Sequence, residues 1–143
     1  MKYISLLLTT LLATSAFAAT FDETLELAKK GDAVAQANIG NMYELGIGGV
    51  DENQFLAVEG YKKAARQGYA AAQNNLGFMY SFGKGVPKDI VVGYAWLSLA
   101  KMQGSKVASY NISIGKSTMT AKQIADGQAL AAKCFESDYK DCD

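Results

Sequence analysis

Four copies of the pattern S-x-x-K have the clearest potential for chemistry in this sequence. In penicillin-recognising enzymes this spacing places a nucleophilic serine next to a lysine. The copies are SFGK from Ser81, SLAK from Ser98, SIGK from Ser113 and SDYK from Ser137. The companion K-T-G and S-D-N elements of those enzymes are absent from the sequence. Composition therefore explains the pattern better than an active site does, and a small envelope hydrolase acting on β-lactam or peptidoglycan-type substrates is the alternative hypothesis.

Two glycine-rich turns, which begin at Gly46 and Gly83, have the composition of a phosphate-binding loop. A P-loop needs G-x-x-x-x-G-K-[ST], so that backbone amides, a lysine and a hydroxyl converge on phosphate and Mg²⁺. Neither turn has this pattern, and Lys84 of the second turn is replaced by Ile47 in the first. The glycines are what the turns share, so we expect them to end helices and reverse the chain.

Residue types that bind metals or catalyse proton transfer are scarce. The sequence has no histidine, the commonest metal ligand and the usual general base at neutral pH. The acidic residues Glu136, Asp138, Asp141 and Asp143 lack the regular ligand spacing and turn glycine of an EF-hand. We therefore expect no cofactor and a solvated acidic tail.

Charge and the first residues restrict the function further. The chain has 143 residues, with 14 Lys and Arg against 14 Asp and Glu, which gives no electrostatic footprint for nucleic acid. It begins MKYISLLLTTLLATSAFA, where one cation precedes an apolar run and an A-x-A motif. This order predicts a signal peptide over residues 1–18. The apolar run is too short to span a membrane, so we expect residues 19–143 to be exported, either periplasmic or secreted, without membrane insertion.

The two cysteines, Cys134 and Cys142, lie eight positions apart near the C-terminus. An even number of cysteines in an exported protein favours a disulfide, and free thiols or a metal site are the alternatives. The lack of histidine weighs against a metal site. A disulfide that closes so short a loop contributes roughly 2.5 kcal/mol by the chain-entropy estimate.

A duplicated segment organises the rest of the chain. Residues 35–48, AQANIGNMYELGIG, recur at 72–85 as AQNNLGFMYSFGKG, with eight identities in fourteen positions. A period of this length is the signature of a repeat protein. Apolar residues at i, i+4, i+7 and i+8 predict one buried helical stripe in each copy. These residues are Ala35, Ile39, Met42 and Tyr43, and then Ala72, Leu76, Met79 and Tyr80.

Each copy is followed by a second predicted helix. We expect Asp51 and Asp89 to be the N-caps of these helices, which run to Gly68 and Gly104. Asp51-x-x-Gln54 also resembles a capping box.

Further helices flank the repeats. Thr20-x-x-Glu23 and Thr120-x-x-Gln123 are capping boxes that open an N-terminal and a C-terminal helix. A short helix is expected over residues 106–114, where a third repeat would start.

The pattern A-Q-x-N-[IL]-G-x-M-Y, a glycine turn and then A-A-x-x-G resembles the Sel-one-like repeat, a relative of the tetratricopeptide repeat. The resemblance covers Asp32 to Gly104, and the tail MTAKQIADGQALA resembles the capping helix of exported bacterial members. The family usually has Trp-Tyr in the second helix, where this chain has Gly60-Tyr61 and Trp96-Leu97. The resemblance implies an α/α superhelix that holds protein partners.

Gly60 and Gly93 fall within the second helices of the two repeats. The family's preferred alanine is kept at Ala57 and becomes Gly93 in the second repeat. Each mid-helix glycine is expected to cost on the order of 1 kcal/mol relative to alanine.

A second stripe on the first helices is the candidate binding surface, since first helices line the concave face in tetratricopeptide relatives. It consists of Val34, Asn38, Asn41 and Leu45, and then Ala71, Asn75, Phe78 and Phe82. Asparagine amides can hold a peptide backbone, and phenylalanines can supply apolar anchors. We predict partner-binding roles for Asn38, Asn41, Asn75, Phe78 and Phe82. The alternative is that the asparagines brace the neighbouring helix.

These patterns together predict an all-α protein, an α/α superhelical solenoid of two helix-turn-helix repeats with N- and C-terminal capping helices. The expected divisions are 19–31 for the N-terminal helix, 32–68 and 69–104 for the repeats, and 105–143 for the C-terminal cap. The predicted function is a non-catalytic exported scaffold that binds a protein or peptide partner through the groove lined by the first helices.

Overall fold

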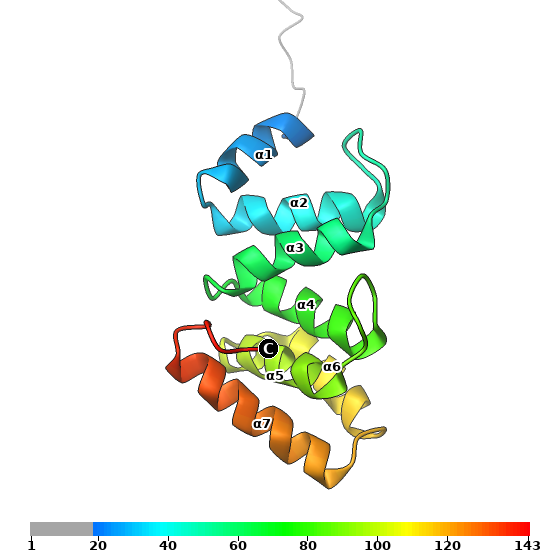
Figure 1. Cartoon of the computed structure of the whole chain (residues 1–143), viewed down its shortest axis with the longest axis vertical. Coiled ribbons are helices and arrows are strands. Elements are labelled where there is room, and N and C mark those ends of the chain that lie inside the picture. The colour runs from blue at the N-terminus through cyan, green and yellow to red at the C-terminus, as the bar shows by residue number, and fades with distance from the viewer. Residues whose placement is uncertain (1–18) are drawn as a thin grey trace, which may run out of the picture.

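The structure, a computed structural model, describes residues 19–143, and the predicted signal peptide at 1–18 lies outside the described residues. Within the described range the chain forms seven helices and no strand. The helices are α1 (Phe21–Lys29), α2 (Ala33–Leu45), α3 (Gln54–Ala65), α4 (Ala70–Phe82), α5 (Ile90–Met102), α6 (Lys106–Lys116) and α7 (Ala121–Glu136). They stack along the long axis of the molecule (Figure 1), so the predicted helical solenoid is confirmed.

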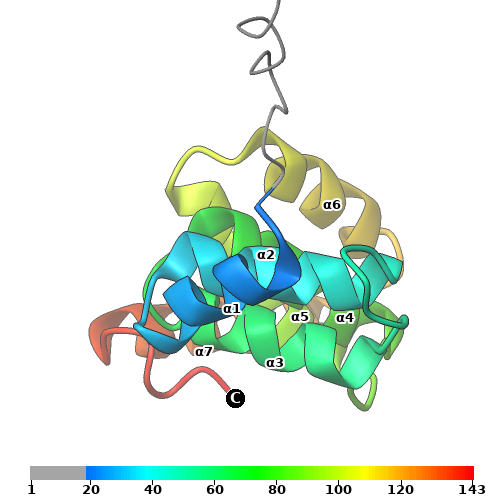
Figure 2. The same cartoon turned by 90° about the horizontal axis from the view of Figure 1, so that it is seen from above.

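Two helical hairpins form the middle of the stack. Helix α2 packs on α3, and α4 packs on α5, while the contact between α3 and α4 joins the two hairpins. Helix α1 covers α2 at one end of the stack. At the other end α6 and α7 both pack on α5, and they lie on opposite sides of the molecule (Figure 2). None of the described helices is both long enough and apolar enough to cross a bilayer.

The predicted buried stripe is best formed in the second repeat, at the centre of the stack. Ala72, Leu76 and Met79 are fully buried and Tyr80 is nearly so. In the first repeat Ala35 and Ile39 are buried, whereas Met42 and Tyr43 are half-buried. The difference follows from position, because α2 has only the short α1 on its outer side.

Most predicted helix ends are confirmed. Thr20 and Thr120 both form capping boxes. Gly46 and Gly83 end α2 and α4 in the left-handed conformation, with φ of 63° and 67°.

The predicted N-cap at Asp51 is wrong. Asn53 caps α3, and its side-chain oxygen accepts a hydrogen bond from the Leu56 amide at 3.0 Å. The turn of the first repeat contains the additional Gly49, so Asn53 rather than Asp51 occupies the position of Asp89, which does cap α5 as predicted.

Gln73, the glutamine of the repeated A-Q pair, is a fully buried polar side chain. Its Nε2 donates to the Ala65 carbonyl at the end of α3, at 3.2 Å. Its Oε1 accepts from Gln103 Nε2, just beyond the end of α5, at 2.8 Å. Gln73 therefore ties the ends of two successive second helices together.

Gln36 makes the matching contacts in the first repeat. Its Nε2 donates to the Ala28 carbonyl in α1 at 3.2 Å, and its Oε1 accepts from Gln67 Nε2 at 2.8 Å. Because Ala28 takes the place that Ala65 has in the second repeat, α1 occupies the position of a preceding second helix. The A-Q pair thus marks the joint between neighbouring units.

Gly60 and Gly93 lie where the two helices of each hairpin cross. A Cβ at Gly60 would lie 2.7 Å from the backbone nitrogen of Gly40. A Cβ at Gly93 would lie 2.8 Å from the carbonyl oxygen of Gly77. The low helix propensity of these glycines is therefore offset by a backbone approach that no other residue allows.

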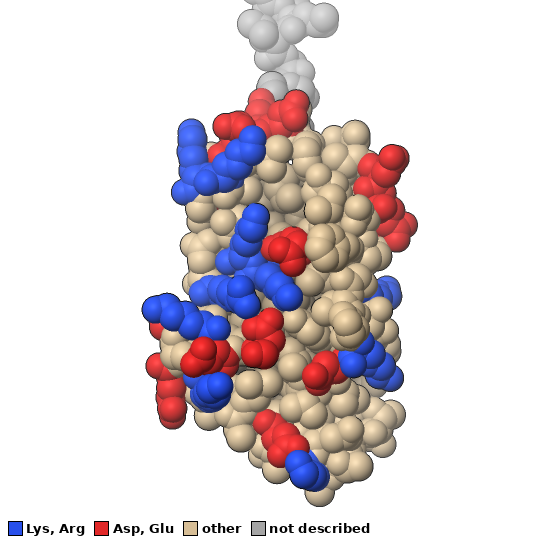
Figure 3. Space-filling view, in the orientation of Figure 1, with Lys and Arg blue, Asp and Glu red and all other residues tan. Residues whose placement is uncertain are grey.

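The C-terminal tail folds back onto the repeats. The predicted disulfide between Cys134 and Cys142 is confirmed, and both cysteines are buried. The tail is not simply solvated as predicted, because Asp143 Oδ1 lies 3.1 Å from Arg66 Nη2 and Asp143 Oδ2 accepts from the Tyr80 hydroxyl at 3.2 Å. Figure 3 shows basic and acidic side chains side by side on this face.

The Tyr80 hydroxyl that bonds Asp143 has a raised pKa, and its burial is the main cause.

Removing the disulfide by the double substitution Cys134→Ser and Cys142→Ser is expected to lower the free energy of unfolding by about 2.5 kcal/mol. The bridge closes a loop with a sequence separation of 8, and the estimate is the entropy that it removes from the unfolded chain. Urea denaturation followed by the fluorescence of Trp96 measures the change. Reductant should lower the stability of the wild type and leave the double variant unchanged. Equal midpoints for oxidised and reduced wild type would contradict this role.

Candidate binding groove

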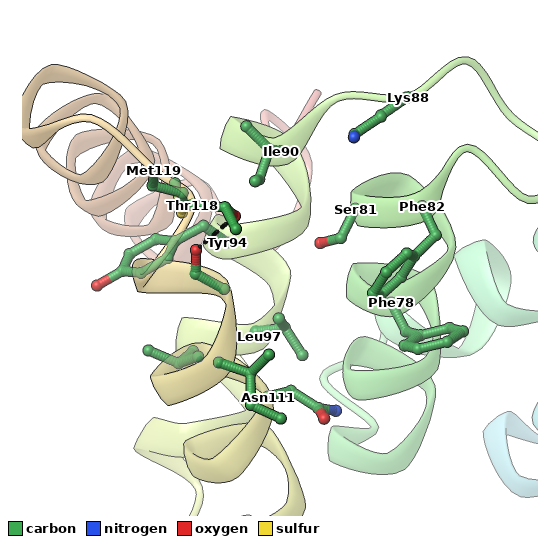
Figure 4. A pocket seen from close by; sticks show the side chains of 13 residues that line it. Phe78, Ser81, Phe82, Lys88, Ile90, Tyr94, Leu97, Asn111, Thr118 and Met119 are labelled. Carbon is green, nitrogen blue, oxygen red and sulfur yellow. Dashed lines mark hydrogen bonds between the residues drawn. The ribbon is translucent and has the colours of Figure 1, made fainter.

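A cavity of about 350 Å³ opens between α4 and α6, with α5 behind it (Figure 4). Its wall is mainly apolar. The apolar residues are Phe78 and Phe82 from α4, Ile90, Tyr94 and Leu97 from α5, Ile112 and Ile114 from α6, and Met119 from the turn before α7. Ligand sites typically have this size and this apolar lining, with a few polar groups that fix orientation.

Phe78 and Phe82 are the two predicted site residues that the structure places at the cavity. They are one helical turn apart, their ring centroids are 4.6 Å apart, and they lie against each other at its edge (Figure 4). Phe78 is half-buried, whereas Phe82 is 61% exposed. An aromatic side chain that is exposed beside an apolar hollow is a typical anchor for a partner.

Asn75, a third predicted site residue, belongs to a chain of polar side chains that crosses the stack. Asn111 in α6 donates to the Asn74 side chain at 3.1 Å, and Asn74 donates to the Asn75 side chain at 3.3 Å. Asn75 lies near the Tyr61 hydroxyl, which donates to Glu44 Oε2 at 2.5 Å. Burial, followed by the Glu44 acceptor, raises the pKa of Tyr61 far above its usual value, so this hydroxyl keeps its proton. Asn75 is thus linked to α6 through Asn74, and both the bracing interpretation and a binding role for it stay predictions.

Asn38 and Asn41 lie on the exposed face of α2, outside the cavity lining. No hydrogen bond joins either amide to another residue of the described chain. Val34 and Leu45 on the same face are also exposed, at 49% and 59%. This face therefore presents both amides and apolar groups, and a binding role for its asparagines stays a prediction.

Lysines are the charged residues at the cavity. Lys88 is part of its lining, and Lys84 Nζ lies 5.2 Å from the centroid of the Phe78 ring. Among the described residues, no aspartate or glutamate lines the cavity. Asp89 follows Lys88, but its carboxylate accepts from the amides of Val91 and Val92 at 3.0 Å each.

The contribution of α6 to the cavity did not follow from the sequence. Ile112 and Ile114 line the cavity, whereas the exposed apolar residues Val107 and Tyr110 of the same helix do not.

A family model described as Sel1 repeat matches residues 33–69 and 70–105, which correspond to α2 with α3 and α4 with α5. The chain belongs to the Sel1 repeat family. The resemblance stated from the sequence is therefore confirmed. Proteins built from Sel1 repeats are generally scaffolds for protein–protein interaction. No curated protein matches the chain by sequence.

The solved structures that are similar to the chain include two of Sel1 repeat proteins. One is a protective antigen present in uropathogenic Escherichia coli strains, with an SLR fold, at a TM-score of 0.77 and 31% identity, covering 83% of this chain and 26% of that chain. The other is a Sel1 repeat protein from Oxalobacter formigenes, at a TM-score of 0.62 and 35% identity, covering 64% of this chain and 68% of that chain. The chain thus spans about a quarter of the length of the E. coli antigen.

The serines of the S-x-x-K patterns are dispersed over this Sel1 repeat structure. Ser81, Ser98 and Ser137 each donate their hydroxyl to a backbone carbonyl three or four residues earlier, at 2.8–2.9 Å. This is the usual bond of a serine in or at the end of a helix. Within residues 19–143 no serine hydroxyl is hydrogen-bonded to a lysine side chain, since the Ser137 hydroxyl accepts from the backbone amide of Lys140, and no group of three His, Cys, Asp or Glu side chains could hold a metal. Sel1 repeat folds are typically non-catalytic scaffolds, and the positions of these serines fit that description.

Proposed function

We propose that this Sel1 repeat protein is a non-catalytic, exported scaffold that binds a peptide segment of a partner protein in the groove formed by α2, α4 and α6. The observation that carries the proposal is the apolar cavity between α4 and α6, with the exposed Phe82 at its edge. Exposed aromatic side chains next to a concave apolar surface are frequent hot spots of protein–protein interfaces.

The cavity supports binding of a side chain, and the rest of the groove supports binding of a peptide. Its volume of about 350 Å³ has room for one or two large apolar side chains. Helix α2 has the same place in the first repeat as α4 has in the second, so its exposed face extends the surface along the stack. The amides of Asn38 and Asn41 on this face can bond the backbone of an extended peptide. Phe78 and Phe82 then anchor one of its side chains.

Export is supported by the covalent chemistry and by the first residues. The Cys134–Cys142 disulfide is typical of an oxidising compartment. The sequence over residues 1–18 has the order of a signal peptide. We infer that the scaffold works in the periplasm or outside the cell.

Phe82→Ala is expected to reduce capture of the partner at least tenfold, because the substitution removes the exposed aromatic anchor at the cavity. Crosslinking of tagged protein in native cell envelopes, followed by quantification of each captured protein, measures this. Phe55→Ala is the matched control, since Phe55 is 63% exposed against 61% for Phe82 but lies on α3 outside the cavity lining.

Both alanine variants should keep a free energy of unfolding within about 0.5 kcal/mol of the wild type, as exposed positions usually do. Equal capture of every partner by the two variants would show that the cavity edge is not the binding surface. Asn75 is unsuited to this test because its substitution would also break the polar chain with Asn74.

A further inference from the structure

We propose that the peptide bound at the cavity is acidic, with Asp or Glu side chains next to the apolar residue that enters the cavity between α4 and α6. This inference rests on the proposed function and specifies the chemistry of the partner. It is carried by the lysines at this part of the groove.

Lys84 and Lys88 place two positive charges at one edge of the cavity. Lys88 lines the cavity, and the Lys84 ammonium lies over Phe78, 5.2 Å from the ring centroid. A cation held over an aromatic face in this way is partly fixed in position. Lys84 therefore contacts Phe78 and also places a positive charge beside it.

Neither of these charges is part of an ion pair within the described part of the chain. The ion pairs found there involve Lys29, Lys62, Arg66 and Lys122, and neither Lys84 nor Lys88 takes part in one. The nearest acid in sequence, Asp89, caps α5 and forms no ion pair with either lysine. A carboxylate from a partner would meet two cations that have no ion-pair partner within the described part of the chain.

Comparison of the two repeats shows that the turn does not need lysines at positions 84 and 88 in order to fold. Lys88 lies next to Gly83 as Glu52 lies next to Gly46, so the two side chains occupy equivalent positions in their turns. Lys84 is likewise replaced by Ile47 in the first repeat. The turn thus forms with either charge, and the lysines occur in the repeat that contains the cavity.

Asp or Glu side chains of a peptide that extends beyond the cavity would fit beside Lys84 and Lys88. Groups of opposite charge at the rim of an interface give specificity and speed association, while the buried apolar contact supplies most of the affinity. The exposed face of α2 provides further surface for the chain on one side of the anchor. We therefore commit to internal Asp or Glu side chains rather than to a terminal carboxylate.

Selection of random twelve-residue peptides, displayed as N-terminal fusions to a carrier, on the immobilised protein tests the inference. Selected sequences should contain one large apolar residue with Asp or Glu within about two positions of it. A selected peptide, synthesised with an amidated C-terminus, should bind about tenfold more weakly to the Lys84→Glu, Lys88→Glu double variant. Selection on that variant should favour Lys and Arg in place of Asp and Glu.

The control variant carries Lys101→Glu and Lys133→Glu, which change the net charge equally at exposed positions outside the cavity lining. It should bind the acidic peptide with the wild-type affinity. Peptides that lose binding with Phe82→Ala but have no acidic preference would overturn this inference and leave the proposed function intact. If no peptide is selected, or if binding is unaffected by Phe82→Ala, the proposed function fails together with the inference.

Discussion

Gln73→Ala is expected to lower the free energy of unfolding by about 3 kcal/mol. The side chain is fully buried and bridges the Ala65 carbonyl and the Gln103 amide. Its loss removes two hydrogen bonds, each contributing about 1 kcal/mol, and leaves a cavity in a packed core. Urea denaturation followed by Trp96 fluorescence measures the change.

Two further variants separate the polar part of this effect from the packing part. Gln73→Leu fills most of the space but forms neither hydrogen bond, so it should cost about 2 kcal/mol. Gln36→Ala should cost less than Gln73→Ala, because Gln36 is less completely buried and one of its two hydrogen bonds goes to the nine-residue α1 at the end of the stack. A loss below about 1 kcal/mol for Gln73→Ala would show that close packing alone joins the two repeats.

Local signals explain why so much of the fold follows from the sequence. The capping boxes at Thr20 and Thr120 and the glycines at Gly46 and Gly83 each act within one turn of helix, and all four are found as predicted. The wrong N-cap at Asp51 arose where the repeats differ in length. Because Gly49 is an insertion, the N-cap of α3 is Asn53, which aligns with Asp89 of the second repeat. Only this alignment with the second repeat could have indicated Asn53.

The cavity could not be predicted, because it depends on where the last two helices pack. In each repeat the second helix packs on its own first helix, whereas α7 packs on α5. Position 109 of α6, where a third repeat would have the bridging glutamine, is a serine whose hydroxyl bonds the Ser105 carbonyl at 3.1 Å. With no glutamine in α6 to tie a following second helix, α7 is free to pack elsewhere, and a hollow remains beside α6.

The contacts of the Asn75 side chain also depend on how the helices pack in the folded protein. The helical spacing places it on the stripe with Phe78 and Phe82, and it leaves both a groove contact and a bracing contact open. The link to α6 runs through Asn74 and its partner Asn111, and no local sequence pattern indicates these contacts. Phe78 and Phe82 could be predicted as surface anchors from the sequence, since a large apolar side chain on the outer stripe of a helix indicates a binding surface without knowledge of its neighbours.

Gly85→Ala is expected to lower the free energy of unfolding by about 3 kcal/mol and tests whether the glycine turns are joints between repeats. An added Cβ would overlap the backbone carbonyl of Gln54 at the start of α3, and φ of 67° is unfavourable for any side chain. Gly49→Ala is the matched control, because Gly49 has φ of 88° but no atom within 4 Å of its Cβ position, so it should lose only about 1 kcal/mol. Chemical denaturation measures both changes. Both variants have the cost of a positive φ, but only Gly85→Ala also has the clash with Gln54. The difference between the two losses therefore measures the cost of that clash. Equal losses would mean that this turn can move away from α3 at little cost, so that the glycine would serve the left-handed conformation alone.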